Sequence, residues 1–304
     1  MKVVVAGGSG ALGRRLCDDL AARGHDVVVL SRTPRPGGHR QVRWDGRTVG
    51  PWATELAGSA VVNLAGELVD RRPTARNREL LTRSRVEPTL ALRGAAEQLG
   101  VPVPVWLQAS TTAIHGDAGE ALLDEGSPPG DGPPQMVDVA RAWEAAAAGA
   151  PAERQVMLRT SVVLDRDTPA LDRLAGLARW GLGGRVGSGR QRTSWLHVED
   201  WLAITRWALG VDDDVPAPPL SGVLVASSPN PVRNAELMAA LRRALHRPAA
   251  PPTPAPLVRV GAVLLRTDPA LALAGRRVVS RTLAEAGYRW RHPDLDEALA
   301  DLLG

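Results

Sequence analysis

The stretch VVVAGGSGALGRRL, from Val3 to Leu16, constrains this chain more than any other part of its sequence. An apolar run is followed by three glycines, Gly7, Gly10 and Gly13, and then by a helical pattern. This order predicts a buried strand, a tight turn and the start of a helix. Such a turn directs backbone N–H groups and a helix N-terminus toward one point, where they can bind a pyrophosphate. The alternative is a strand-to-helix turn that holds no ligand.

The rest of the first half repeats this order of apolar strand and helix. Expected helices at 11–23, 75–99 and 136–148 alternate with expected strands at 27–30, 61–64, 105–109 and 156–164. The repeated order predicts an α/β protein with a Rossmann-type, doubly wound parallel sheet. Open sheets of this kind bind ligands at the carboxyl ends of their strands, where the glycine turn falls.

The second half differs in composition. It contains a glycine-rich loop at 181–189, a mixed strand and helix at 195–207, a late strand at 223–226, and proline-rich segments at 211–219 and 249–256. Because proline cannot continue a helix, the last segment is a connector to a short helical tail. We predict a coenzyme-binding Rossmann domain at 1–165, helped by parts of 190–230. Residues 166–304 then form a smaller mixed α/β substrate or cap region, which includes a C-terminal domain at 250–304.

Composition excludes several classes of function. Lys2 is the only lysine, so 36 of the 37 basic residues are arginines, spread among 33 acidic residues. Without a basic run, a net charge of +4 does not indicate nucleic-acid binding. No stretch of about 18 apolar residues and no signal peptide is visible, so we expect a cytoplasmic protein that binds no membrane. Cys17 falls at helical spacing with Leu16 and Leu20, which indicates a core position rather than a nucleophile.

The residues after the second expected strand bear on the choice of dinucleotide. An NAD enzyme carries Asp or Glu at this place, where it accepts hydrogen bonds from the ribose 2′-hydroxyl. This chain has Ser31 and Arg32 instead, with no carboxylate there to repel a phosphate. Since a guanidinium pairs well with a 2′-phosphate, the sequence favours NADP(H) over NAD(H). The other interpretation of Arg32 is a solvated surface side chain.

Further motifs extend over most of the chain. They are NLAG at 63–66, SRVEPT at 84–89, QASTTAIHG at 108–116, LRTSVVL at 158–164, GSGRQRTSWLHVEDW at 187–201 and GRRVVSRTLAEAGYRWRHPDLDEAL at 275–299. With the glycine spacing, these motifs resemble the extended short-chain dehydrogenase/reductases of the NAD-dependent epimerase/dehydratase family. They are similar to one atypical branch, the sugar-nucleotide-epimerase-like NADP-binding proteins with a C-terminal domain of unassigned function. The resemblance implies coenzyme contacts at Gly7, Gly10, Ala11, Leu12, Gly13, Ser31, Arg32, Asn63, Leu64, Ala65, Gly66, Arg85, Ser110 and Arg159.

The usual catalytic pair of that family is missing. Short-chain dehydrogenases act through Tyr-x-x-x-Lys, in which the lysine lowers the tyrosine pKa and the tyrosine exchanges a proton with the substrate oxygen. Tyr288 is the only tyrosine and Lys2 the only lysine, so the pair is absent in any alignment. Spacing from His115 puts the two expected positions near Met136 and Ala140, and neither side chain can donate a proton.

Other catalytic candidates lie at the same end of the sheet. Sugar-nucleotide 4,6-dehydratases carry Thr-Asp-Glu where this chain has Thr111, Thr112 and Ala113, which disfavours dehydration by their route. The resemblance implies that Thr111 hydrogen-bonds a substrate carbonyl. His115 can titrate near neutral pH, and Glu67 follows the loop after the fourth strand, so either can move a proton. The alternatives are a packed histidine and a solvated loop acid.

Further candidates lie in the second half. Gln191 and Arg192 are candidate substrate or anion contacts, although arginine is so abundant that any one position can be incidental. Trp195, beside the glycine-rich loop, is a candidate floor for a substrate pocket. The alternative is a core position. The chain has nine tryptophans, one tyrosine and no phenylalanine, so tryptophans supply most of its aromatic side chains. His197 and Asp200 are interpreted as structural, and no metal site is predicted.

Three functions remain open from the sequence. The first is an NADP(H)-dependent oxidoreductase or epimerase-like enzyme acting on a small carbonyl or hydroxyl compound. The second is a sensor or scaffold that binds NADP(H) without catalysis, and the third is a non-redox isomerase or cyclase that uses the same pocket. A general acid contributes about 10²- to 10⁴-fold in rate, so an enzyme without one is slow or needs little proton assistance. We expect a monomer or a homodimer.

Overall fold

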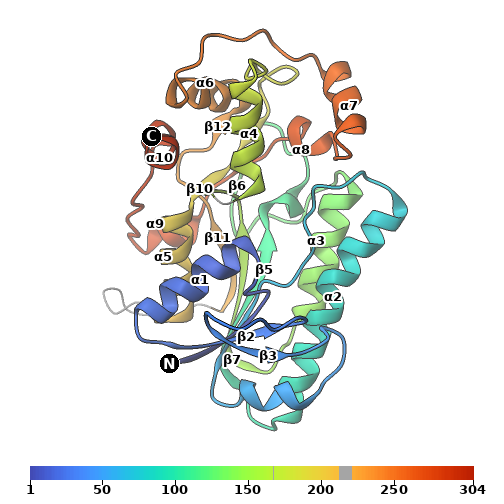
Figure 1. Cartoon of the computed structure of the whole chain (residues 1–304), viewed down its shortest axis with the longest axis vertical. Helices are drawn as coiled ribbons and strands as arrows, with labels where there is room; N and C mark the ends of the chain where they lie inside the picture. The colour runs from blue at the N-terminus through green and yellow to red at the C-terminus, as the bar shows by residue number, and fades with distance from the viewer. Residues whose placement is uncertain (167, 212–220) are drawn as a thin grey trace.

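The computed structural model of the chain describes residues 1–166, 168–211 and 221–304 (Figure 1). Its central sheet consists of β1 (Lys2–Ala6), β2 (Asp26–Ser31), β3 (Arg40–Arg43), β4 (Ala60–Asn63), β5 (Val103–Thr111), β7 (Ala152–Thr160) and β11 (Gly222–Ala226). The strand order is β11-β7-β5-β4-β1-β2-β3, and every pairing within it is parallel. The predicted Rossmann-type sheet is confirmed. The proline-rich segment expected at 211–219 lies, apart from Val211, outside the described residues.

The sequences of the strands explain their places in the sheet. The side chains of β1 from Val3 to Ala6 have no exposed surface, and β1 lies between β2 and β4. Strands covered on both faces read as continuous apolar runs, which is why β1 is easy to recognise. By contrast, β3 has the sequence RQVR and only partly covered side chains at the edge of the sheet. An exposed, charged edge strand has no apolar pattern, and the sequence did not predict it.

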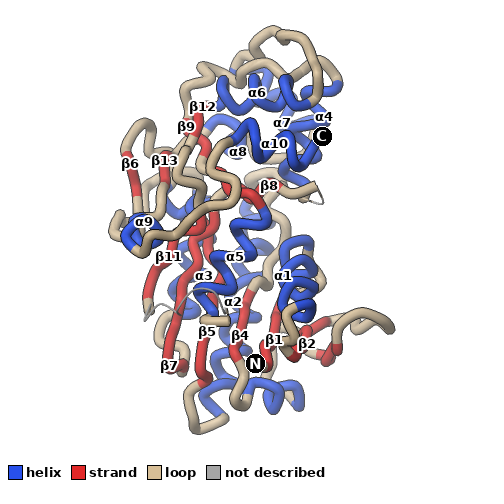
Figure 2. The backbone as a smooth tube through the Cα atoms, turned by 90° about the vertical axis from the view of Figure 1, so that its left-hand side faces the viewer, coloured by secondary structure: helices blue, strands red, loops and turns tan. Residues whose placement is uncertain are grey.

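Helices cover both faces of the sheet (Figure 2). The helices α1 (Ala11–Ala22) and α5 (Val198–Leu209) share one hydrophobic cluster with the sheet, and α2 (Ala75–Gln98) packs on the opposite face beside α3 (Pro134–Ala147). The three helices expected in the first half are therefore confirmed to within two residues at each end. Cys17 is fully buried on α1, as predicted, and burial raises the pKa of its thiol to about 12.

A smaller region lies beyond the carboxyl edge of the sheet (Figure 1). The helices α4 (Pro169–Arg179), α6 (Asn234–Ala244) and α10 (Leu295–Leu303) share their own hydrophobic cluster, which is separate from the two clusters of the sheet. The remaining elements are η1 (Pro51–Leu56), η2 (Thr112–His115), β6 (Leu122–Leu123), β8 (Val162–Leu164), β9 (Arg192–Thr193), β10 (Trp195–His197), β12 (Val232–Arg233), α7 (Ala255–Leu264), α8 (Ala270–Leu273), β13 (Arg277–Val278) and α9 (Arg281–Glu285).

Two expectations change in the structure. The strand expected at 156–164 is two strands, because the chain turns at Ser161 and β8 leaves the sheet to pair with β10. An apolar run cannot reveal such a change of direction. The late strand joins the central sheet as β11, so part of 190–230 does pack on the first region, while the domain division itself remains a prediction. Within the described residues, no helix combines the length and apolar character needed to cross a bilayer.

Candidate functional site

The glycine turn is shaped by close backbone packing. Gly7 has a φ of +82°, and a Cβ atom on it would lie 2.7 Å from the backbone carbonyl carbon of Leu64. A Cβ atom on Gly13 would lie 2.3 Å from the oxygen of Gly7. In the described part of the chain, no side chain caps the N-terminus of α1 at Gly10, and its first turn holds no acidic residue. Its first N–H groups are therefore available to an anion.

A cavity of about 800 Å³ opens beside this turn, between the ends of β2 and β4 and the helix α2. That volume falls in the range of small-molecule and coenzyme sites. The predicted site residues that line it are Gly7, Gly10, Ser31, Arg32, Leu64, Ala65, Gly66 and Glu67. The cavity thus collects residues from three loops that are far apart in the sequence.

Part of the cavity wall was not foreseen. Sequence reasoning missed the residues after β3 and one face of α2, namely Trp44, Asp45, Gly46, Arg47, Arg76, Asn77, Glu79, Leu80, Arg83, Ser84, Glu87 and Pro88. The sequence marks this part of the wall only by a glycine, Gly46. The glycine ends the turn at 44–46, where its φ is +72°. Asp45 accepts hydrogen bonds from the hydroxyl and N–H of Thr48 and from the N–H of Arg47, which lower its pKa to about 2. Asp45 thereby shapes the turn.

Several charges of the cavity are already paired. Arg83 donates to Glu87 over 2.8 Å, which lowers the pKa of that carboxyl group, and Arg47 donates to the same carboxylate over 2.9 Å. The Nη2 atom of Arg32 lies 3.8 Å from Oε1 of Glu67. This corrects the expectation that no carboxylate faces Arg32, because the loops after β2 and β4 meet at one edge of the sheet. The Arg32 side chain is 73% exposed, so its guanidinium can move from Glu67 to a phosphate.

Two predicted coenzyme contacts lie behind the cavity wall. Asn63 is fully buried, and its side chain accepts from the N–H of Ala65 over 3.1 Å and donates to Thr89 over 2.8 Å. Arg85 is almost fully buried and donates to the backbone oxygen of Glu67 over 2.9 Å. Burial lowers the pKa of Arg85 to about 10, so it stays charged. Both side chains hold the loop after β4 in place and do not line the cavity, so coenzyme contact at these two positions stays a prediction.

Ser110 and Arg159 are not in the cavity either. They face each other across β5 and β7, and both bind Glu144 on α3. The guanidinium of Arg159 donates to the two carboxylate oxygens over 2.8 and 2.9 Å, and its side chain is only 6% exposed. Glu144 engages both side chains beneath α3, and coenzyme contact by Ser110 and Arg159 stays a prediction.

The two catalytic candidates near the end of β5 differ in exposure. Thr111 is half-buried, and its hydroxyl accepts the N–H of Ala113 over 3.1 Å, which leaves the hydroxyl hydrogen free to donate. His115 is only 2% exposed, and its Nδ1 lies 3.0 Å from the oxygen of Pro128, so Nδ1 carries the hydrogen. Burial lowers the pKa of His115, which therefore stays neutral at physiological pH. As a buried neutral imidazole, it matches the packed histidine that was the alternative.

The face of α3 carries the positions expected for the catalytic pair. Met136 and Ala140 are both buried there, at 8% and 1% exposure. The single tyrosine and the single lysine lie elsewhere: Tyr288 packs against the cluster of α1 and α5, and Lys2 pairs with Glu55 over 2.8 Å. Neither can reach α3 as the chain is folded.

The candidates in the second half have structural contacts. The side-chain amide of Gln191 donates to two backbone carbonyls, each over 3.0 Å, and Arg192 donates to Glu120 over 2.8 Å. Trp195 has no exposed surface, lies in the cluster of α4, α6 and α10, and donates to the oxygen of Asn230 over 2.9 Å. A side chain without exposed surface cannot form the floor of a pocket, so this assignment is corrected. Gln191 holds the glycine-rich loop and shows no free amide hydrogen.

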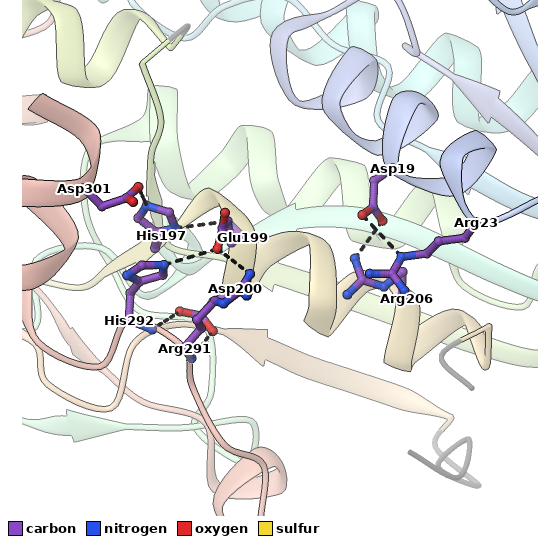
Figure 3. A network of polar contacts seen from close by, with 9 residues as sticks. All are labelled: Asp19, Arg23, His197, Glu199, Asp200, Arg206, Arg291, His292 and Asp301. Carbon is purple, nitrogen blue, oxygen red and sulfur yellow. Dashed lines mark hydrogen bonds and ion pairs between the residues drawn. The ribbon is translucent and has the colours of Figure 1, made fainter. Parts of the chain in front are cut away.

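A cluster at the N-terminus of α5 bears on metal binding (Figure 3). Potential ligand atoms of His197, His292 and Asp301 lie within 4.8 Å of one another. However, Nδ1 of His197 accepts the N–H of Glu199, so Nε2 carries the hydrogen and donates to Asp301 over 3.2 Å. A metal at Nε2 would leave the ring without any hydrogen, whereas metal-bound histidines donate from their other nitrogen. Asp200 accepts two backbone N–H groups of the C-terminal segment, so the cluster joins α5 to that segment.

Comparisons with protein families agree with this geometry. A profile of the NAD dependent epimerase/dehydratase family matches residues 3–136, and a profile of a domain of unknown function (DUF1731) matches residues 253–302. The epimerase family protein SDR39U1 of Bos taurus is 36% identical over 308 residues, which cover 100% of both chains. The epimerase family protein YfhF of Bacillus subtilis (strain 168) is 29% identical over 311 residues, covering 100% of this chain and 98% of that protein.

Solved structures give the same result. The crystal structure of human epimerase family protein SDR39U1 (isoform2) with NADPH has a TM-score of 0.85 at 34% identity, covering 100% of this chain and 99% of that one. A nucleoside-diphosphate sugar epimerase from Corynebacterium glutamicum has a TM-score of 0.77 at 30% identity, and the match covers 100% of this chain and 58% of that one. This chain belongs to the NAD-dependent epimerase/dehydratase family and is similar over its whole length to SDR39U1.

Proposed function

We propose that this protein binds NADP(H) in the cavity beside the glycine turn and is an atypical short-chain dehydrogenase/reductase, an oxidoreductase or epimerase-like enzyme acting on a small molecule. The observation that carries the proposal is the turn itself. Its glycines leave no space for side chains, and the first N–H groups of α1 have no competing cap. The NADPH in the human SDR39U1 crystal structure supports the choice of coenzyme.

The chain offers a separate contact for each part of the coenzyme. The turn from Gly7 to Gly10 and the N-terminus of α1 would hold the pyrophosphate. The loop from Leu64 to Gly66 would lie against the adenosine ribose. Arg32 would leave Glu67 and pair with the 2′-phosphate, since a charge-assisted contact to a dianion exceeds one to a partly exposed carboxylate. A bound coenzyme would supply or accept a hydride at its nicotinamide end.

Proton transfer is the weak part of this site. Thr111 can orient a substrate oxygen with its free hydroxyl hydrogen, but a threonine hydroxyl is a poor acid. His115 is buried and neutral, and Glu67 lies on the adenosine side in ion pairs with Arg32 and Arg71. A water molecule is then the proton source, which implies slow turnover or a substrate that needs little proton assistance.

The lack of a good proton donor also favours a second function, NADP(H) binding without catalysis. Met136 and Ala140 are packed into the core, so neither position expected for the catalytic pair carries a titratable group, and Glu144 on the same helix is engaged by Ser110 and Arg159. Chemistry and binding are therefore separate questions, and each needs its own measurement. A non-redox isomerase or cyclase has no observation in its favour beyond the shared pocket.

Tryptophan fluorescence provides the first test, because Trp44 lines the cavity. Titration of the purified protein should give saturable binding of NADPH and at least tenfold weaker binding of NADH. Failure to bind either coenzyme would falsify the proposal. Single-turnover absorbance of bound NADPH, followed with a panel of small carbonyl compounds, then separates enzyme from sensor. Oxidation with any of them favours the enzyme, and unchanged NADPH throughout favours the sensor.

A further inference from the structure

The C-terminal segment brings one arginine to the catalytic end of the sheet. In β13, Arg277 and Val278 pair with Leu122 and Leu123 of β6. The preceding residue, Arg276, is held by its N–H to the oxygen of Arg192 over 2.8 Å. A Cβ atom on Gly275 would lie 2.5 Å from the nitrogen of Arg192, so only glycine permits this approach. The backbone on both sides of Arg276 is therefore fixed.

The guanidinium of Arg276 contacts the place expected for the missing tyrosine. Its Nε donates to the oxygen of Gly116 over 3.0 Å, and its Nη2 lies 3.8 Å from Sδ of Met136. Gly116 has a φ of +65°, and a Cβ atom on it would lie 2.1 Å from the oxygen of Asp131. The carbonyl that holds the guanidinium thus depends on a position that only glycine can occupy. The arginine and Met136 are brought together across 140 residues of sequence.

Within the described residues, Arg276 forms no ion pair with a carboxylate, a property that it shares with Arg85 and that separates it from Arg159 and Arg206. Arg159 pairs with Glu144 over 2.8 Å, and Arg206 pairs with Asp19 over 2.7 Å. Among residues 1–166, 168–211 and 221–304, no carboxylate oxygen lies within ion-pair distance of Arg276, and its Nη1 has no hydrogen-bond partner yet is not sealed from solvent. Burial lowers its pKa, and the nearby charge of Asp117, whose carboxylate accepts the N–H of Gly275 over 3.0 Å, opposes this shift. The charge is therefore compensated only at longer range, by Asp117, and Nη1 can still donate to an anion from outside the chain.

We infer that Arg276 binds the carboxylate of the substrate at the position that the tyrosine occupies in relatives, and that residues 253–302, the domain of unknown function, thereby complete the active site. The inference rests on the proposed function. A guanidinium offers paired N–H donors that match the two oxygens of a carboxylate. With one guanidinium and the carboxylate of Asp117 nearby, the charge balance favours a monoanion, because a phosphate dianion would add more uncompensated negative charge. The substrate class is therefore a small carboxylic acid that also carries a carbonyl or hydroxyl group.

Oxamate, an inert monocarboxylate, is the probe. It should bind to the NADPH-saturated full chain, and Arg276→Gln should weaken this binding about 10- to 100-fold, the loss typical of a hydrogen bond to a charged group. Arg276→Lys keeps the charge but not the paired donors, so it should be intermediate. The matched control is Arg277→Gln on the same strand, which should bind oxamate as the wild type does. NADPH affinity should stay the same in all three variants, because Arg276 does not line the coenzyme cavity.

Several results would overturn the inference. They are a wild type that binds NADPH but not oxamate, an Arg276→Gln variant that binds oxamate normally, and inorganic phosphate binding more tightly than oxamate. If Arg276→Gln does not fold, oxamate binding by Arg276→Lys decides, and wild-type affinity in that variant counts against the paired contact. If the wild type does not bind NADPH, the proposed function is refuted instead. Oxamate titration of the free protein would then still test Arg276 by itself.

Discussion

The cavity beside the glycine turn and the face of α3 lie along the same edge of one sheet. Backbone atoms shape the first, and side chains shape the second. The cavity is made by backbone, through a glycine turn in which a Cβ atom on Gly13 would lie 2.3 Å from a carbonyl oxygen. The face of α3 is made by side chains, and the two positions there at which spacing predicts the acid and its lysine hold Met136 and Ala140. Backbone binding and side-chain chemistry can therefore change independently on one fold.

The comparison also explains why the fold tolerates the change at α3. Methionine and alanine are buried without needing a hydrogen-bond partner, so these two positions pack on the sheet at no electrostatic cost. The glycine turn has no such tolerance, because its atoms are in contact. We therefore expect the largest effects from substitutions in the turn, and smaller ones toward the surface.

Gly13→Val should have the largest effect. The added side chain must displace the backbone of Gly7, and such overpacking costs about 3 kcal/mol in the free energy of unfolding, with loss of measurable NADPH binding. The matched control is Gly176→Ala in α4, where no heavy atom lies within 4 Å of the added Cβ. This control should raise stability by about 0.5–1 kcal/mol. Urea unfolding and coenzyme titration measure both, and normal NADPH affinity in the valine variant would contradict a backbone-made site.

Glu144→Gln changes the contact between α3 and the sheet. It should lower the free energy of unfolding by about 2–3 kcal/mol, since it leaves Arg159 buried without its counter-charge. NADPH affinity should not change, because neither residue lines the cavity. Glu285→Gln on α9 is the control: its carboxylate is 72% exposed, and loss of its ion pair should alter stability by less than about 0.5 kcal/mol. A large fall in NADPH affinity with Glu144→Gln would mean that the two regions are coupled.

Arg32→Gln should weaken NADPH binding about tenfold and leave NADH binding unchanged, since only NADPH has a 2′-phosphate for a charge-assisted contact. Arg93→Gln, on α2 and paired with Glu97, removes the same charge away from the cavity and should change neither affinity. Equal losses for both coenzymes with Arg32→Gln would assign the guanidinium to a part that the coenzymes share.

A fall in pH should have the smallest effect on stability. Burial lowers the folded-state pKa of His115 and of His197, so the unfolded chain binds these protons more readily. The stability that this provides is complete above the unfolded pKa of about 6.5 and is lost as pH falls from there toward the folded pKa. His197→Asn, which can still cap α5, should reduce the fall in Tm between about pH 7 and 5. An identical slope in the variant would show that His197 is not a source of it.

The sequence identified elements whose signals are local. The glycine turn, the buried strand β1 and the amphipathic helix α1 follow from spacing within a few residues, and all lie where they were expected. The edge strand β3 was missed because charged side chains conceal its pattern, and the residues that follow it in the cavity were missed with it. The break between β7 and β8 was not predicted, because an apolar run does not show where the chain changes direction.

What the chain determines by composition and short-range order is the glycine turn, the parallel sheet and the lack of a tyrosine–lysine pair. Only tertiary structure decided which arginines are engaged: Arg32 beside Glu67, Arg159 on Glu144, and Arg276 against Met136. The physical reason is that backbone conformation is set by neighbours along the chain, whereas a charge is balanced by whatever folding brings near. In a chain with 36 arginines, identity alone cannot tell a paired guanidinium from one that awaits a ligand.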